Sequence, residues 1–262
     1  MKITQQSLRI GVLAMAMLTA ACQEADPYPY PNPRPRDHLF SDTLNSSVRS
    51  LVEKSSKARF DLVAQARNPA FFQVDLSTAF NHDTVAWLGS GYTLVRLTSG
   101  EHRYYGVPFR IAEPSGKNVI AMQSDRFKQM PLSVSVPVNK RADAVYFLHA
   151  CGWAAWGQTR QYVVHYADGT KEAINISPAG TTHGESENVQ DWYESDVVDK
   201  AEAKFVALPN PDRPSDVSDL RYIYVLEWRN PHADREIKSF EFLGGVGSVS
   251  MFVFSVTLVE AK

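Results

Sequence analysis

Three tryptophans are the residues of this chain whose chemistry most suggests a binding site. Trp153 and Trp156 follow an apolar run and flank two alanines, and Trp192 lies in a more polar stretch. Indole rings can stack on the apolar C–H faces of sugar rings, and binding pockets combine such apolar walls with a few polar groups. The sequence therefore predicts a sugar-binding platform at Trp153 and Trp156, with Trp192 nearby. The alternative is that these indoles pack on the core, the first two as a lid over it.

Polar residues that could hydrogen-bond to sugar hydroxyls precede Trp192. We expect His183, Glu185 and Asp191 to be these candidates. Glu187 and Glu194 lie in the same stretch, so a solvated loop is one alternative and a set of oxygen ligands for calcium is another. No recognised calcium loop and no C-x-x-C or H-E-x-x-H spacing occurs in the sequence, so we expect no metal and no cofactor.

The sequence contains no familiar catalytic motif. The nearest strings to a serine-hydrolase G-x-S-x-G motif, at 89–91 and 244–248, lack its spacing, and no phosphate-binding loop occurs. We therefore expect a non-catalytic protein. A glycan hydrolase or esterase with an unrecognised site remains the alternative.

Overall charge also excludes one class of partner. The chain has 262 residues, with 27 Lys+Arg against 29 Asp+Glu and a net charge of −2. Nucleic-acid binding requires a concentrated excess of basic residues, so we expect none. Hydrophobic residues make up 44%, which is typical of a folded protein and excludes disorder of the whole chain.

The N-terminus has the pattern of a bacterial export signal. Lys2 and Arg9 precede an uncharged apolar run over 10–18 that is too short to span a bilayer. The string Leu18-Thr19-Ala20-Ala21-Cys22 then resembles the bacterial lipobox, with Thr19 where Leu is usual. This resemblance implies a lipoprotein signal peptide over 1–21 and lipidation of Cys22, with palmitate among its acyl chains. A plain signal peptide is the alternative.

A lipid on Cys22 would anchor the protein to a membrane without spanning it. We expect the bacterial cell envelope, and Gln23 after the cysteine favours the outer membrane, on its periplasmic or surface face. Alternating prolines make residues 22–40 an extended tether. Besides the membrane, the expected partner is a glycan, and other envelope proteins are the alternative.

The remaining chain predicts a short helical lead-in followed by strands. Residues 41–68 have helical spacing of apolar residues, clearest over 42–54, with Ser41 or Asp42 as the cap and a second short turn over 60–63. Residues 69–262 consist of short β-branched and aromatic runs separated by turn signals, including Asp168-Gly169 between two alternating runs. The expected strands are 71–75, 92–97, 103–111, 119–122, 132–137, 144–150, 161–166, 172–176, 204–208, 222–228, 237–243 and 249–258.

This pattern predicts an all-β fold, an antiparallel two-sheet β-sandwich with a short N-terminal helical segment. The long apolar run 222–228 is expected to cross the centre of a sheet. Cys151, His149 and His165 lie on predicted strands, and we expect them to be structural residues of the core or of a sheet face.

Several segments together are similar to one known family. They are FFQVDLSTAF (71–80), YGVPFRI (105–111), AVYFLHACGW (144–153), YVVHYADGT (162–170), NVQDW (188–192), EWRNP (227–231) and EIKSFEF (236–242). Their order and spacing resemble the galactose-binding-like, jelly-roll carbohydrate-binding modules associated with glycoside hydrolases. The resemblance implies carbohydrate binding in polysaccharide capture or degradation by the domain at 69–262. Such modules are appendages of hydrolases, and no hydrolase domain is left over in this chain, so an assembly lipoprotein that binds another envelope protein is the alternative function.

Overall fold

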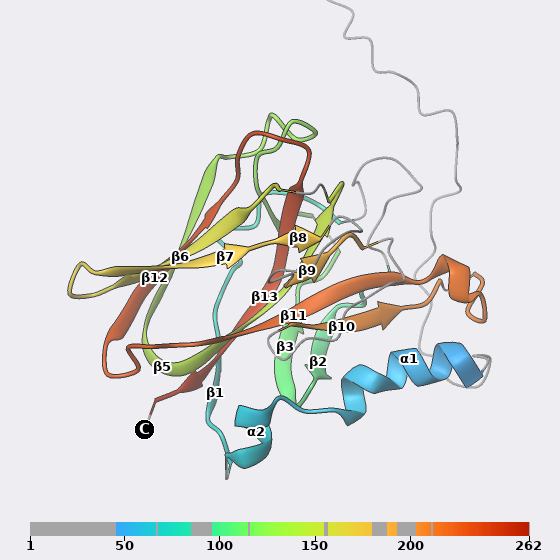
Figure 1. The fold of residues 1–262 in the computed structure, drawn as a ribbon, viewed down its shortest axis with the longest axis horizontal. Coiled ribbons are helices and arrows are strands. Elements are labelled where there is room, and N and C mark those ends of the chain that lie inside the picture. Colours follow the sequence, from blue (N-terminus) through green and yellow to red (C-terminus); the bar gives the residue numbers. More distant parts are fainter. Residues whose placement is uncertain are drawn as a thin grey trace, which may run out of the picture.

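The computed structural model of this protein describes residues 46–66, 68–84, 96–114, 116–154, 157–179, 188–192, 203–210 and 212–261. Two helices, α1 (Ser46–Lys57) and α2 (Asp61–Gln65), precede the strands (Figure 1). The strands are β1 (Phe71–Gln73), β2 (Gly100–Tyr104), β3 (Val107–Ile111), β4 (Ile120–Ala121), β5 (Ser133–Gly152), β6 (Arg160–Tyr166), β7 (Lys171–Ile176), β8 (Pro178–Ala179), β9 (Val189–Gln190), β10 (Ala203–Leu208), β11 (Arg221–Arg229), β12 (Glu236–Leu243) and β13 (Ser250–Glu260). A short 3-10 helix, η1 (Val217–Asp219), lies between β10 and β11.

The long strand β5 belongs to both layers of the sandwich. Its first part pairs with β12, which pairs with β6, and β6 pairs with β7. Its last part lies between β11 and β13; β11 pairs with β10, and β13 pairs with β1 and β4. Between the two parts the register shifts, and Asn139 has a positive φ of 52°. Such a bulge bends a strand, which lets β5 pass from one layer to the other.

Aromatic side chains from both layers fill the space between them. Phe147 of β5 packs against Tyr162 of β6 and Phe240 of β12, with ring centroids 5.1 Å and 5.5 Å apart. All three side chains are fully buried. The predicted antiparallel β-sandwich is confirmed. The parallel pair β8–β9 is an exception to the antiparallel pattern.

A third layer covers the other face of β5, β11 and β13. It consists of α2 and the β2–β3 hairpin, and it buries Phe60 against Tyr146 with ring centroids 5.2 Å apart. Because both faces of these strands are covered, β13 and the last part of β5 are buried almost continuously. This explains why their sequences are mostly apolar and lack the alternation of a half-exposed strand.

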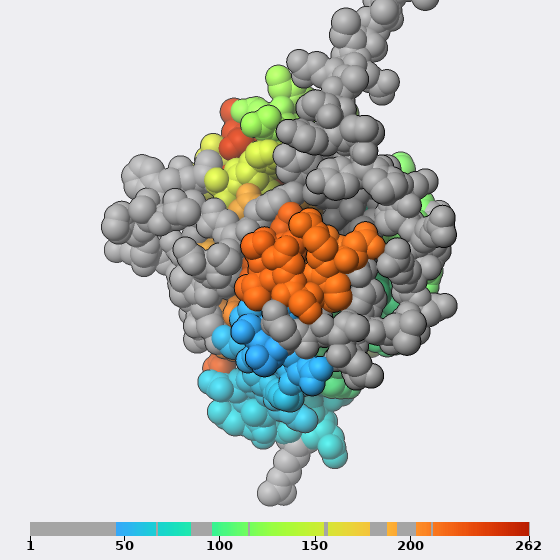
Figure 2. Space-filling model, turned by 90° about the vertical axis from the view of Figure 1, so that its right-hand side faces the viewer, coloured from blue at the N-terminus to red at the C-terminus, as the bar shows by residue number. Residues whose placement is uncertain are grey.

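Helix α1 packs beside β10, at the edge of this arrangement (Figures 1 and 2). Val48 is buried there, and the Lys54 ammonium lies 4.7 Å from the centroid of the Phe205 ring. The predicted helical lead-in is therefore present as two helices that pack on the strands. The proposed caps, Ser41 and Asp42, lie outside the described residues.

The structure differs from the expected strands in two places. The run 103–111 is part of a hairpin, because Tyr105 and Gly106 have positive φ angles of 50° and 81° and form a two-residue turn. The expected strands 132–137 and 144–150 are both parts of β5. Most of the expected strand 92–97 lies outside the described residues.

Other local predictions are confirmed. Asp168-Gly169 forms the turn between β6 and β7, with a φ of 88° at Gly169 that favours glycine. Strand β11 has neighbours on both sides, as expected for a central strand. Cys151 is fully buried, and its thiol donates to the Gln190 carbonyl at 3.0 Å. Within the part of the chain that the structure describes, no helix is long and apolar enough to cross a bilayer.

Candidate functional site

The end of β5 presents Trp153, the first of the predicted platform residues. Its backbone has a φ of 54°, which turns the chain as it leaves the strand. The indole is half-buried; the Phe127 ring approaches it at a centroid distance of 5.8 Å, and the Arg126 guanidinium lies 5.6 Å from its centroid. Ser248 Oγ donates to the Trp153 carbonyl at 3.2 Å. These contacts fix one orientation of an indole that remains partly exposed.

Asp191 lies beside this turn, although it is distant in sequence. It forms a parallel bridge with Cys151, and its Oδ2 accepts a hydrogen bond of 3.1 Å from the Ala154 amide. The structure therefore brings together two of the residues that the sequence predicted, an aromatic ring and a carboxylate. Such a pair supplies an apolar wall and a hydrogen-bond acceptor.

Trp192 has a different position from its neighbour Asp191. Its side chain is only 3% exposed, and its indole stacks on the Phe252 ring with centroids 6.4 Å apart. Trp192 thus packs in the core, the alternative stated above, and its ring is not presented to solvent. Trp156, His183, Glu185, Glu187, Glu194 and Cys22 lie outside the described residues.

The loop that joins β10 to β11 lies at this same end of the sandwich. The Tyr222 amide, at the start of β11, donates to the Trp192 carbonyl at 2.9 Å. We call this end, formed by Trp153, Asp191, Trp192 and the β10–β11 loop, the loop end.

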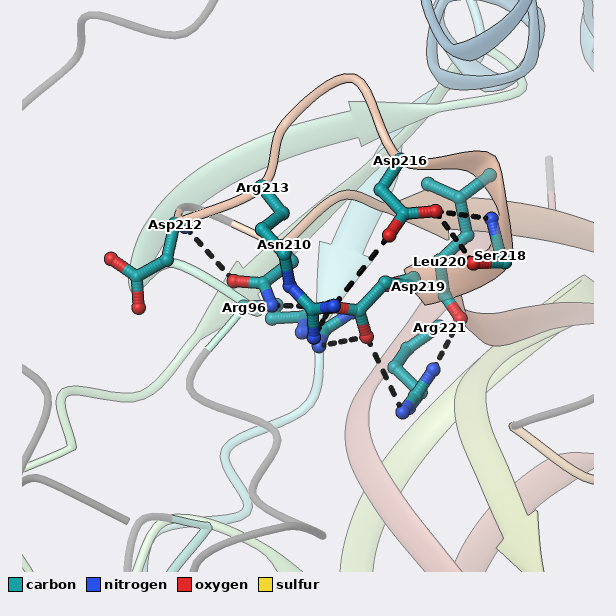
Figure 3. Close-up of polar contacts among 9 residues, drawn as sticks. All are labelled: Arg96, Asn210, Asp212, Arg213, Asp216, Ser218, Asp219, Leu220 and Arg221. Carbon is teal, nitrogen blue, oxygen red and sulfur yellow. Dashed lines mark hydrogen bonds and ion pairs between the residues drawn. The ribbon is translucent and has the colours of Figure 1, made fainter.

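A network of arginines around Asp219 holds the β10–β11 loop (Figure 3). Arg96 and Arg213 bind the Asp219 carboxylate at 2.9 Å and 2.7 Å, and Arg221 lies 3.5 Å from it. Arg96 also donates to the Asp219 carbonyl, and the Asn210 amide donates to the carboxylate. Three guanidinium groups of the loop end therefore share the Asp219 carboxylate, and Asp216 lies 3.6 Å from Arg213 as a second acidic partner.

Asp219 is charged at neutral pH despite its burial. Burial raises the pKa of its carboxyl group, but hydrogen bonds from Arg96 and Asn210 and the positive charges of Arg96 and Arg213 outweigh this effect. The net result is a pKa below the ordinary value, because these donors favour the ionised form.

Sequence reasoning did not identify Arg126, Phe127 or the Asp219 network. The charge-dense string 212–216 was the available signal for the network, but its main partner Arg96 lies more than a hundred positions earlier. Nothing in the local sequence of Arg126 and Phe127 indicates that they contact Trp153, because this contact depends on the packing of separate loops.

The two histidines expected to be structural occupy different surroundings. His149 is fully buried, and its Nδ1 lies 2.9 Å from the Tyr162 hydroxyl. Burial lowers the pKa of His149 to about 3, so its imidazole is neutral at physiological pH. His165 is half-buried, with Nε2 2.9 Å from Glu241. Both predictions of a core or sheet-face position are confirmed.

No group of three or more His, Cys, Asp or Glu side chains arranged to hold a metal ion occurs within the described ranges. No family model matches this chain, and no curated protein matches it. The candidate site therefore stands on geometry: a fixed aromatic ring, an adjacent carboxylate and a nearby set of arginines at one end of an antiparallel β-sandwich.

Proposed function

We propose that this protein is a non-catalytic, glycan-binding lipoprotein of the bacterial cell envelope, and that its loop end contacts the sugar. The observation that carries this proposal is the contact between the Trp153 turn and Asp191, made by the hydrogen bond from the Ala154 amide to the Asp191 carboxylate. The indole provides a surface for the C–H face of a sugar ring, and the carboxylate accepts hydrogen bonds from its hydroxyls. The resemblance to carbohydrate-binding modules supports the same function.

The lipid anchor at Cys22 and the proline-rich tether over 22–40 belong to this proposal. An extended tether of this kind spans about 3 Å per residue. It would hold the folded domain at a distance from the outer membrane. At that distance the domain can reach polysaccharides.

The test of the proposed function is the Trp153→Ala variant. We expect the full chain, purified in detergent, to bind at least one glycan on an array, and the variant to bind that glycan about tenfold more weakly, which corresponds to about 1.4 kcal/mol. Loss of stacking is the physical reason, and titration calorimetry measures it.

Trp153→Phe is the matched control, because it keeps an aromatic ring at the same backbone position. We expect it to bind within about threefold of the wild type and both variants to keep the wild-type thermal unfolding midpoint. Wild-type affinity in Trp153→Ala, or no glycan bound by the wild type, would contradict the proposal. Unfolding of both variants would identify Trp153 as a core lid, and release of shortened products would identify a hydrolase.

The Cys22→Ser variant tests the anchor. Without the thiol no acyl chain can be attached, so we expect the protein to move from the membrane fraction to the soluble fraction and to keep its signal peptide. Fractionation and metabolic labelling with palmitate measure this change, with Cys151→Ser as the control that keeps the label. An unlabelled, soluble wild-type protein would refute lipidation.

A further inference from the structure

A concave region lies at the opposite end of β11 from the loop end. Strand β10 begins at Ala203, which pairs with Leu226, so residues 227–229 of β11 extend beyond this pairing. A cleft of about 550 Å³ forms there between these residues, Lys204 of β10 and residues 59–61 at the start of α2. We call it the Glu227 cleft.

Glu227 is the most unusual residue of this cleft, because it is a carboxylate buried beneath α2. The residue is 7% exposed, and its Oε1 accepts a hydrogen bond of 2.9 Å from the Tyr146 hydroxyl. Arg229 Nε lies 3.8 Å from the same oxygen. Among the described residues no hydrogen bond to Oε2 is formed, so this oxygen remains available as an acceptor for a bound molecule.

Burial raises the pKa of Glu227, while the Tyr146 hydrogen bond and the charges of Arg229 and Lys204 oppose this effect and Asp61 adds to it. The pKa lies above the ordinary value as a net result. A carboxyl group in a cleft whose pKa is raised by burial is typical of functional sites. A buried carboxylate lowers the stability of the folded protein relative to an apolar residue at the same position. A position with a purely structural role does not need such a group.

Positive charge predominates around this carboxylate. Arg59 and Arg229 are exposed at the cleft, the Arg229 side chain to 62%. The Lys204 ammonium lies 5.8 Å from the centroid of the Phe60 ring. These three cations outnumber Glu227 and Asp61, so the cleft favours an anionic ligand.

Trp228 follows Glu227 on β11, so its side chain lies on the opposite face of the strand, half-buried against the core between the two layers. A ligand suited to the cleft therefore has a hydroxyl that donates to Glu227 and carboxylates that bind the arginines. Arginine binds planar carboxylates in a bidentate manner, which favours this anion.

We propose that the Glu227 cleft binds an acidic saccharide, with Arg59, Lys204 and Arg229 holding its uronate carboxylates and Glu227 accepting from a hydroxyl. Glu227 lies six positions beyond Arg221 along β11, about 20 Å at the usual rise of a strand. The cleft is thus a separate site, and its test is independent of Trp153.

The experiment uses the full chain in detergent and tetragalacturonate as the probe. We expect the wild type to bind tetragalacturonate at least tenfold more tightly than the methyl-esterified tetramer, which has no charge. The double variant Arg59→Ala with Arg229→Ala is expected to lose at least tenfold in affinity. Lys171→Ala with Lys238→Ala is the matched control, because it removes the same charge from exposed positions on β7 and β12 and should bind as the wild type.

Glu227→Gln tests the acceptor within the cleft. It keeps the side-chain volume and replaces the carboxylate by a weaker neutral acceptor, so we expect threefold to tenfold weaker binding and an unfolding midpoint at least as high as that of the wild type. Unchanged or tighter binding would refute the role of Glu227. Equal affinity for the esterified tetramer, an equal loss in the lysine control, no binding by the wild type, or binding only to phosphatidylglycerol vesicles would overturn the proposal of an acidic-saccharide site.

Discussion

Replacing Asp219 by asparagine is expected to lower the free energy of unfolding by about 3 kcal/mol, since breaking a buried ion pair leaves uncompensated charge. The carboxylate is 7% exposed and is bound by Arg96 at 2.9 Å and Arg213 at 2.7 Å, with Arg221 at 3.5 Å. Asparagine has nearly the same size, but it has no negative charge. Its side-chain NH2 group would also face the N–H groups of the arginines, with which it cannot form hydrogen bonds. The three guanidinium groups would then lose the carboxylate that they share.

Asp216→Asn makes the same chemical change three positions away. Asp216 lies 3.6 Å from Arg213 and accepts from the Ser218 amide, a contact that asparagine can also make. We therefore expect a loss below about 1 kcal/mol. Urea unfolding at neutral pH measures both variants. Similar losses in the two would contradict a special role of Asp219 in holding the β10–β11 loop.

Acidification from pH 7 to pH 5 is expected to destabilise the protein by about 2 kcal/mol through His149 alone. Burial lowers the pKa of His149 from 6.5 to about 3, so the folded protein keeps this imidazole neutral while the unfolded chain takes up a proton. The unfolded state therefore binds more protons below pH 6.5. The contribution of His149 is fully present above that pH and is lost as the pH falls toward 3.

His149→Gln isolates this effect, because glutamine does not titrate and can still reach toward the Tyr162 hydroxyl. We expect its stability to fall between pH 7 and pH 5 by about 2 kcal/mol less than that of the wild type, measured by urea unfolding at each pH. The pKa of His82 is also lowered by burial, but it is present in both proteins and cancels in the comparison. An identical pH dependence of His149→Gln and the wild type would refute the prediction.

The third layer matters for both candidate sites, and a two-sheet sandwich alone would not contain it. Asp61 of α2 and the preceding Arg59 and Phe60 line the cleft with Glu227. Phe127, in the loop after β4, contacts Phe252 on this same face of β13 and Trp153 at the loop end. Residues packed on this face of the sheet thus form one side of the Glu227 cleft and contact the turn at Trp153.

Local features of the sequence correctly predicted the strands and much of the fold. The β-branched and aromatic runs are strands because their period and turn signals act between neighbouring residues, as at Asp168-Gly169. The continuous apolar character of 222–228 and of Cys151 and its neighbours indicated burial. The hairpin at Tyr105-Gly106 was missed, because a tyrosine at positive φ leaves no strong turn signal.

By itself, then, the sequence determined the all-β class, most strand positions and the candidate residues Trp153 and Asp191. Only the tertiary structure decided that Asp191 accepts from the Ala154 amide next to Trp153, that Trp192 is buried on Phe252, and that Glu227 lines a cleft with Arg59 and Lys204. Glu227 is the one charged residue in the apolar run 222–228, a signal whose meaning depends on which element packs against it. The physical reason is that strand formation and turns follow from local backbone preferences, whereas contacts between distant segments follow from how complete layers pack.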